Sequence, residues 1–311
     1  MEQWDTVIIG AGAAGLTAAQ YSARANLKVL VIEEMAHGGQ ALLIDALENY
    51  PGQLEPVDGY TWSDRMKAQA ERFGAVMRST SVLGIKKNGD TFIISSTDGD
   101  IEAKTVIVAT GAKHRHLNAP GEETFIGRGV SYCATCDGPF FRNKHVVVVG
   151  GGDSACDEAM FLSKLASSVT MVHRRDRFRA QKALAERVLS NEKIKVVWNT
   201  VVKEIRGTKS VESIVLENSV DGSVQDLPCS AVFVFVGSDP QTAFLPETIE
   251  KDDTGSIVTN QRMETNIPGL YAVGDVRATP FRQIITAASD GATAAHCASQ
   301  YIDELEGHAY R

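Results

Sequence analysis

Residues 6–15 read TVIIGAGAAG, a short apolar strand that leads directly into the motif G-x-G-x-x-G. An alanine-rich helix follows, and a second apolar strand, KVLVI, occupies residues 28–32. In a dinucleotide-binding β-α-β unit, the first glycine permits a tight turn, the second lets the backbone touch a pyrophosphate, and the third lets helix and strand pack closely. Gly10, Gly12 and Gly15 stand at these places, so the stretch predicts an α/β fold whose helix N-terminus faces a phosphate.

A second copy of this pattern lies further along the chain. Residues 145–155 read HVVVVGGGDSA, in which Gly150, Gly152 and Ala155 form G-x-G-x-x-A between a strand and a helix. Each copy also has a later apolar strand that ends in glycine, at residues 104–111 and 230–237. The sequence therefore predicts an internal duplication of a whole nucleotide-binding domain.

The residues after the second strand of each copy predict different nucleotides. Glu33 ends that strand in the first copy, and a carboxylate there accepts hydrogen bonds from an unphosphorylated ribose, as in FAD or NAD. The second copy has no matching acid and carries Arg174, Arg175 and Arg179 instead. Guanidinium groups pair with a 2′-phosphate, so this copy favours NADPH over a merely solvated basic face. His173, just before them, is expected beside NADPH as a structural residue and not as an acid or base.

A third fragment, residues 267–295, completes neither copy alone. It contains a short strand, a Gly-Asp pair, a loop and a small-residue helix, and its Asp275 can accept hydrogen bonds from ribityl hydroxyls. The simplest arrangement returns it to the first domain. We therefore expect an α/β protein with two Rossmann-like domains of the three-layer ββα type: an FAD domain formed by residues 1–115 and 246–311, and an inserted NADPH domain formed by residues 116–245.

Composition narrows the function classes. The 311 residues carry a formal net charge of −8, which argues against general attraction to nucleic acid or anionic lipid. No apolar run approaches the roughly 20 residues that cross a bilayer, and no secretory signal is visible, so we expect a cytoplasmic protein without membrane partners. Three solitary cysteines, Cys156, Cys229 and Cys297, are expected to be small buried hydrophobic residues.

The other two cysteines, Cys133 and Cys136, lie in YCATCDGPFF, residues 132–141. A zinc site needs about four ligands and a second Cys-x-x-Cys is absent, while a reducing cytosol disfavours a structural disulfide. A redox-active dithiol needs two sulfurs on one turn and an electron source, which two nucleotide sites supply. Asp137 is either a general acid or a turn cap, and residues 140–141, both Phe, either dock a partner or pack in the core.

Together these motifs resemble the low-molecular-weight thioredoxin reductases of bacteria, over essentially the whole chain. The matching stretches are GAGAAGLTAA (10–19), GGQ (38–40), ENYPG (48–52), VIVATGA (106–112), CATCDGPFF (133–141), VVVVGGGDSACDEA (146–159), HRRDRFRA (173–180), YAVGDVR (271–277) and FRQI (281–284). Their order along the chain makes chance resemblance negligible. The resemblance implies a flavoprotein oxidoreductase that uses FAD and NADPH, forms a homodimer and reduces the disulfide of thioredoxin.

Motif and resemblance together assign the site residues. The residues expected to bind FAD are Gly10, Gly12, Ala13, Ala14, Gly15, Glu33, Glu34, Gly39, Gln40, Asn49, Thr110, Gly111, Gly274, Asp275, Arg282, Gln283 and Ile284. Those expected to bind NADPH are Gly150, Gly152, Asp153, Ser154, Ala155, His173, Arg174, Arg175 and Arg179. The expected catalytic residues are Cys133, Cys136 and Asp137, and no metal is expected.

The implied reaction is a relay. Hydride passes from NADPH to FAD, reduced flavin cleaves the disulfide through Cys136, and Cys133 then attacks thioredoxin. Because the redox pair and the NADPH site share the inserted domain, the resemblance implies that this domain rotates on its two linkers between half-reactions. The main alternative is a related flavin reductase that serves another thiol carrier or a peroxiredoxin system. A small-molecule dithiol oxidase and a flavin-binding sensor without turnover are further alternatives.

The sequence departs from many relatives at two places near the C-terminus. Residues 289–291 read Ser-Asp-Gly, where many relatives have an earlier glycine, and Ala278 replaces an acid. The first departure is expected to loosen helix-to-flavin packing slightly, and neither touches the redox pair.

Overall fold

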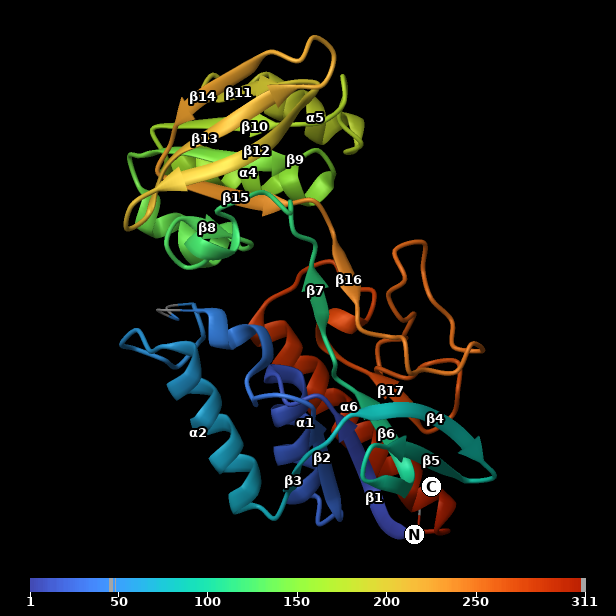
Figure 1. The fold of residues 1–311 in the computed structure, drawn as a ribbon. Coiled ribbons are helices and arrows are strands. Elements are labelled where there is room, and N and C mark those ends of the chain that lie inside the picture. The colour runs from blue at the N-terminus through green and yellow to red at the C-terminus, as the bar shows by residue number, and fades with distance from the viewer. Residues whose placement is uncertain (45–46, 48, 309–311) are drawn as a thin grey trace. The chain divides into compact units, whose positions relative to one another are not determined.

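The computed structural model describes residues 1–44, 47 and 49–308, and the chain divides into two compact units (Figure 1). The first unit contains residues 1–113 and 239–311, and the second contains residues 114–238. The chain passes between them through β7 (Ala112–His114) and β16 (Ser238–Pro240), which form a two-stranded sheet. The sequence placed these crossings after residues 115 and 245, whereas the compact units meet at 113–114 and 238–239.

The first unit is built on a seven-stranded sheet in the order β3-β2-β1-β6-β5-β4, with β17 also paired to β6. Its strands are β1 (Glu2–Ile9), β2 (Val29–Glu33), β3 (Val76–Ser79), β4 (Val82–Asn88), β5 (Thr91–Ser96), β6 (Gly99–Val108) and β17 (Leu270–Ala272). Its helices are α1 (Ala13–Arg24), α2 (Gly59–Arg72) and α6 (Ile284–Leu305), with 3₁₀ turns η1 (Gly39–Leu43) and η4 (Gly274–Val276). All pairs of the sheet are parallel except those of β5 with β4 and β6.

Both faces of the parallel part of this sheet are buried, which is why its strands read as continuous apolar runs. Ile8 of β1 packs among residues of α1 and α6, such as Leu16 and Ala298. Its neighbours Val7 and Ile9 point to the other face and pack in a second cluster. The first unit therefore has the predicted layered α/β architecture.

The second unit repeats this plan with a five-stranded parallel sheet, β11-β10-β9-β15-β8, and a three-stranded antiparallel sheet, β12-β13-β14. Its strands are β8 (Val130–Ser131), β9 (His145–Gly150), β10 (Ser168–Val172), β11 (Ile194–Val197), β12 (Thr200–Gly207), β13 (Val211–Asn218), β14 (Val224–Pro228) and β15 (Ala231–Phe235). Its helices are α3 (Ala134–Asp137), α4 (Asp153–Leu165) and α5 (Lys182–Leu189), with 3₁₀ turns η2 (Glu123–Phe125) and η3 (Gly138–Phe141).

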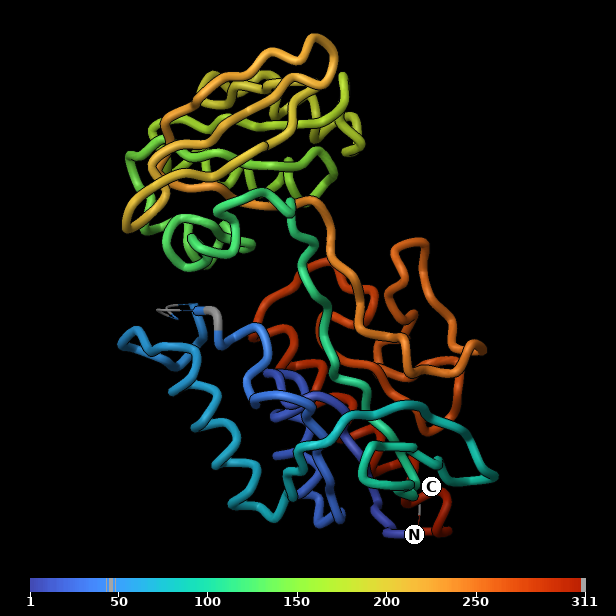
Figure 2. The backbone as a smooth tube through the Cα atoms, viewed as in Figure 1, coloured from blue at the N-terminus to red at the C-terminus, as the bar shows by residue number. Residues whose placement is uncertain are grey.

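The parallel sheet of the second unit lies between helices and the antiparallel sheet. Val148 packs with Leu162 of α4, while Val147 packs with Ile214 of β13 on the opposite face. The predicted α/β fold with a parallel sheet in each unit is therefore confirmed. Figure 2 lets the reader follow the chain out of the first unit and back into it. Cys156, Cys229 and Cys297 are free and buried, as expected.

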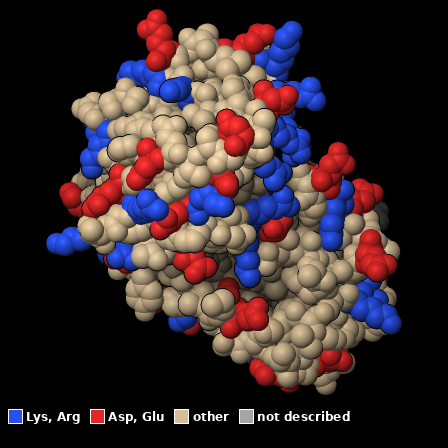
Figure 3. All heavy atoms as spheres, turned by 45° about the horizontal axis from the view of Figure 1, so that its top comes forward, with Lys and Arg blue, Asp and Glu red and all other residues tan. Residues whose placement is uncertain are grey.

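The described residues contain no helix long and apolar enough to cross a membrane. On the face drawn in Figure 3, basic and acidic side chains are interspersed.

A close helix crossing holds the first unit together at Gly291. A Cβ at Gly291 of α6 would lie 2.2 Å from the carbonyl oxygen of Ala14 in α1 and 3.0 Å from the amide nitrogen of Ala18. Both atoms belong to the backbone, so no rotamer change can relieve the overlap.

We predict that Gly291→Ala lowers the free energy of unfolding by at least about 2 kcal/mol, although alanine normally stabilises a helix relative to glycine. Ser289→Ala, on the exposed side of the same helix, serves as the matched control and should leave stability unchanged or slightly higher. Urea unfolding of the purified variants measures both. Equal stability of Gly291→Ala and the wild type would contradict the close crossing.

Candidate active site

The first glycine turn joins β1 to α1. A Cβ on Gly10, which has φ +105°, would lie 2.4 Å from the carbonyl oxygen of Ala109, and one on Gly15 would lie 1.9 Å from the carbonyl oxygen of Gly10. Apart from Gly12 and its two chain neighbours, no atom of the described residues lies within 4 Å of the position that a Cβ would take on Gly12. Neighbouring backbone therefore requires glycine at the first and third positions, while the second leaves open space for a ligand to approach the chain.

Glu33, at the end of β2, fixes this turn. Its Oε2 accepts the Ala11 N–H at 2.8 Å, and its Oε1 accepts the Met35 N–H at 3.1 Å. A carboxylate offers about four acceptor positions, so two remain for ribose hydroxyls. Within the described part of the chain, no side chain caps the helix N-terminus at Gly12. The open glycine, the uncapped helix and the acid fit the adenosine diphosphate part of FAD.

Four segments distant in sequence meet around this turn. A Cβ on Gly39 would lie 3.4 Å from the Cα of Gly12. Gln40 Nε2 donates to the Ala112 carbonyl, and Asn49 Nδ2 donates to Gln283 Oε1 at 3.1 Å. Among the other expected FAD residues, Ala13 and Ala14 begin α1 and Ile284 begins α6. Gly111 has φ +66°, and the Thr110 hydroxyl donates to the Gln241 carbonyl at 2.7 Å. The remaining two, Glu34 and Arg282, are exposed.

Asp275 lies in η4, directly after Gly274. Gly274 has φ +69°, and its Cβ would lie 3.1 Å from the Ala14 Cβ, so this turn contacts the start of α1. Burial raises the pKa of Asp275, with the Arg282 guanidinium opposing the rise and the Asp290 carboxylate adding to it. A poorly hydrated carboxylate of this kind suits a ligand that donates hydroxyl hydrogen bonds.

The second glycine turn, between β9 and α4, repeats the first. A Cβ on Gly150 would lie 2.4 Å from the carbonyl oxygen of Phe235 and 2.7 Å from the Ala155 Cβ, and the position at Gly152 is again open. Asp153 Oδ1 accepts the Gln181 N–H at 2.7 Å. Ser154 is exposed on the first turn of α4.

His173 occupies the place that Glu33 has in the first unit. Val172 pairs with Val149 of β9 as Ile32 pairs with Ile9 of β1, so the next residue in each copy ends at the same edge of the sheet. The His173 ring lies against Gly151, whose Cβ would be 2.3 Å from Nδ1. Burial lowers the pKa of His173, and its buried Nε2 has no partner among the described residues. The uncharged imidazole ring therefore packs against the glycine turn.

Three arginines border the same turn. Arg174, Arg175 and Arg179 are exposed, and no carboxylate of the described chain lies within 4.0 Å of their guanidinium nitrogens. The Arg179 N–H donates to the Gly151 carbonyl at 2.7 Å, which ties the arginine segment to the glycine turn. Exposed guanidinium groups beside a dinucleotide turn fit a 2′-phosphate.

Cys133 and Cys136 form a disulfide across α3, with Cα atoms 5.3 Å apart. Cys133 is the N-cap of this turn, and its Sγ accepts the Cys136 N–H at 3.2 Å. A hydrogen bond from a backbone amide favours the charged form of an acceptor, so reduction leaves Cys133 the sulfur better suited to be a thiolate. Asp137 ends the same turn, half-buried, and its N–H donates to the Cys133 carbonyl at 3.1 Å.

The turn after Asp137 packs against the helix of the second nucleotide turn. A Cβ on Gly138 would lie 3.0 Å from the Leu162 side chain of α4. Phe141 packs edge-on against Phe233, which agrees with core packing, while Phe140 is 46% exposed. Docking of a partner on Phe140 stays a prediction. The redox pair and the arginine-bordered turn therefore belong to one packed unit.

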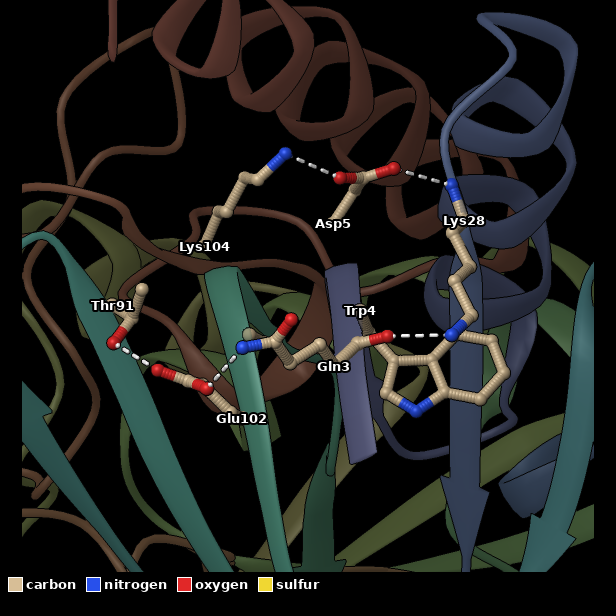
Figure 4. Close-up of a pocket in the computed structure, with 8 residues that line it drawn as sticks. Gln3, Trp4, Asp5, Lys28, Thr91, Glu102 and Lys104 are labelled. Atoms are coloured by element: carbon tan, nitrogen blue, oxygen red, sulfur yellow. Dashed lines mark hydrogen bonds and ion pairs between the residues drawn. The ribbon is translucent and has the colours of Figure 1, made fainter. Parts of the chain in front are cut away.

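A cavity of about 200 Å³ lies elsewhere, near the amino ends of β1 and β6 in the first unit (Figure 4). Each of its charged side chains has a hydrogen-bond partner in the cavity lining. Asp5 accepts from Lys104 Nζ at 2.7 Å and from the Lys28 N–H at 2.8 Å, and Glu102 accepts from Gln3 at 2.9 Å. Dinucleotides bind at the carboxyl ends of parallel strands, so this cavity is not the candidate active site.

Sequence analysis missed Glu158, on the second turn of α4. Its Oε2 is buried and has no hydrogen-bond partner among the described residues. Burial, reinforced by the nearby Asp157 carboxylate, raises the pKa of Glu158 to about 7. No motif marks this residue, since its state depends on what packs over the helix. Buried titratable groups of this kind concentrate at functional sites.

Two dinucleotide folds and one short-range disulfide define the class of nucleotide-dependent disulfide oxidoreductases. The family model for pyridine nucleotide-disulphide oxidoreductases matches residues 4–293. The thioredoxin reductase of Treponema pallidum (strain Nichols) is 57% identical over 303 residues, which cover 97% of this chain and 98% of the relative. That of Peptoclostridium litorale is 44% identical over 308 residues, with 97% and 98% covered.

Solved structures agree with these relatives. Thioredoxin reductase from Streptococcus pyogenes MGAS5005 matches with a TM-score of 0.92 at 45% identity, covering 97% of this chain and 99% of that chain. The Lactococcus lactis enzyme in its FR conformation, also 45% identical, matches with a TM-score of 0.67 over 97% and 100%. The chain therefore belongs to the pyridine nucleotide-disulphide oxidoreductases, among the thioredoxin reductases.

We predict that Glu158→Gln changes stability in a pH-dependent way. Because the pKa is raised on folding, native Glu158 stabilises the fold below its unfolded pKa, and that stability is lost as the pH rises from about 4.5 to about 7. Glutamine does not ionise. As the pH rises from 5 to 8, the free energy of unfolding of the variant should therefore increase by on the order of 2 kcal/mol relative to that of the wild type. Urea unfolding across this range measures the difference, with exposed Glu192→Gln as the control. A difference that stays constant with pH would contradict the buried carboxyl.

Proposed function

We propose that this chain reduces the disulfide of thioredoxin with electrons from NADPH, which pass through FAD to the Cys133–Cys136 disulfide. The observation that carries this proposal is the placement of that disulfide in the same packed unit as the arginine-bordered glycine turn. When bound, FAD would supply a ring system that can take two electrons as a hydride from NADPH and pass two electrons to a disulfide.

The protein's own residues carry the thiol steps. Two electrons and two protons convert the disulfide to a dithiol. By resemblance to the relatives, Cys136 would be the sulfur that receives the electrons from FAD. Cys133 gives its proton to Asp137, and the Cys136 N–H stabilises the resulting thiolate, which attacks one sulfur of the thioredoxin disulfide. Asp137 protonates the departing thioredoxin thiolate and then accepts the Cys136 proton. Cys136 attacks Cys133 in the mixed disulfide, so the internal disulfide re-forms and thioredoxin leaves as a dithiol after taking that proton.

The redox pair and the nucleotide turn use FAD alternately. Both lie in residues 114–238, which two covalent crossings connect to the rest of the chain. We infer that this unit rotates on the crossings between half-reactions. The two solved relatives support this inference, because structures of equal 45% identity and equal coverage of this chain differ in TM-score, 0.92 against 0.67. Such a difference arises when similar domains are arranged differently.

The arginines favour NADPH over another electron donor. A relative from Clostridium acetobutylicum, 32% identical with a TM-score of 0.53, is named a ferredoxin-flavin thioredoxin reductase. Arg174, Arg175 and Arg179 beside an open glycine give this chain the charge that a 2′-phosphate requires. We also propose a homodimer working in the cytoplasm, on the strength of the resemblance, and reduction of another thiol carrier is the alternative to reduction of thioredoxin.

We predict that Arg175→Ala raises the KM for NADPH about 10- to 100-fold and leaves the KM for NADH within about twofold, because only NADPH loses a charge-assisted hydrogen bond. Steady-state kinetics with both nucleotides measures this. Arg177→Ala, in the same exposed segment, is the matched control and should change neither value. Equal changes for NADPH and NADH would argue against a 2′-phosphate site.

We predict that Cys133→Ser and Cys136→Ser each lower thioredoxin reduction at least about 1000-fold, since neither variant can form the internal disulfide. Anaerobic flavin reduction by NADPH should stay within about threefold of the wild-type rate. Cys229→Ala removes a thiol of the same unit outside the pair and should retain turnover. Undiminished thioredoxin reduction by either serine variant would exclude the relay.

A further inference from the structure

Arg277 and Asp290 form an ion pair inside the first unit. Arg277 Nη1 lies 3.2 Å from Asp290 Oδ2, and the two side chains are only 13% and 14% exposed. The Arg277 Nε also donates to the Thr259 hydroxyl at 2.6 Å. A pair this little exposed is costly to break, because removal of one partner leaves the other charge poorly hydrated and unpaired.

The same carboxylate oxygen holds a backbone turn. Asp290 Oδ2 accepts the Gly274 N–H at 3.1 Å, so one side chain of α6 binds both ends of the segment from Gly274 to Arg277. Asp275 and Val276 lie between these two points. The ion pair therefore clamps the turn that carries Asp275.

This clamp lies where three structural elements meet. Gly274 approaches the Cβ atoms of Ala14 in α1 and Ala287 in α6, and Gly291, next to Asp290, approaches the Ala14 carbonyl. Ala14 belongs to the first turn of the helix that follows the first glycine motif. A shift of α6 or of the turn would therefore move Asp275 relative to the helix N-terminus that faces the phosphates.

We propose that Arg277 and Asp290 are positioning residues for FAD: they hold the Gly274–Arg277 turn so that the Asp275 carboxylate meets the ribityl hydroxyls while the α1 N-terminus meets the pyrophosphate. The inference rests on the proposed function, since it assumes that the first unit binds FAD. Arg277 also neutralises the second carboxylate close to Asp275. We assign neither residue a direct contact with the cofactor.

The test compares FAD affinity with the stability of the apoprotein. Asp290→Asn keeps an oxygen for the Gly274 N–H but loses the ion pair, Asp290→Ala loses both, and Arg277→Met leaves the carboxylate unpaired. We expect FAD dissociation constants about 10-fold higher for Asp290→Asn and Arg277→Met, and higher still for Asp290→Ala. The double variant Arg277→Met/Asp290→Asn should recover part of the loss. The control Glu264→Gln weakens the exposed Arg262–Glu264 pair of the same unit and should bind FAD as the wild type does.

Flavin fluorescence gives the affinity, visible circular dichroism of bound FAD reports its surroundings, and thermal unfolding gives the stability of each apoprotein. A purely structural pair would lower the unfolding temperature and leave the affinity within twofold and the dichroism unchanged, which would overturn the proposal. If a single variant does not fold, the charge-free double variant decides: wild-type affinity and dichroism there would also overturn it. Failure of the wild-type protein to bind FAD would instead refute the proposed function.

Discussion

The architecture depends on a close approach between two backbone segments that leaves no room for a Cβ atom. In each unit the first glycine of the turn passes so close to a neighbouring strand that its Cβ would lie 2.4 Å from a carbonyl oxygen, that of Ala109 at Gly10 and that of Phe235 at Gly150. This closeness lets the following helix start directly above the sheet and leaves the second glycine open toward a ligand. The same glycine-to-carbonyl contact occurs once in each unit, so the chain has two proposed nucleotide sites.

The chemistry depends on where the two turns lie relative to the disulfide. Cys133 and Cys136 are in the turn that packs, through Gly138, against the helix of the second glycine turn. The sulfur pair and the proposed NADPH turn therefore keep a fixed relation, because they belong to one packed core. An electron carrier held by the other unit can serve both only if the inserted unit changes its orientation, which is why two crossings and no third connection suit the proposed reaction.

The sequence could predict those features that short spacing determines: both glycine turns, the acid at Glu33, the arginines and the cysteine pair. It could not predict features that depend on packing between distant segments. The unpartnered carboxyl of Glu158 and the Arg277–Asp290 pair are of this kind. The second crossing lies before the expected residue 246 because Gln241 is tied to the first unit: its N–H donates to the Gly111 carbonyl at 3.0 Å, and its own carbonyl accepts the Thr110 hydroxyl.

The proposed relay requires one bound flavin to exchange electrons with the Cys133–Cys136 disulfide. Anaerobic titration of the FAD-loaded protein with dithionite, with thiols counted at each step, measures this exchange. We expect complete reduction to consume two two-electron equivalents per flavin and to yield two new thiols. Complete flavin bleaching after one equivalent, with both sulfurs still oxidised, would contradict it.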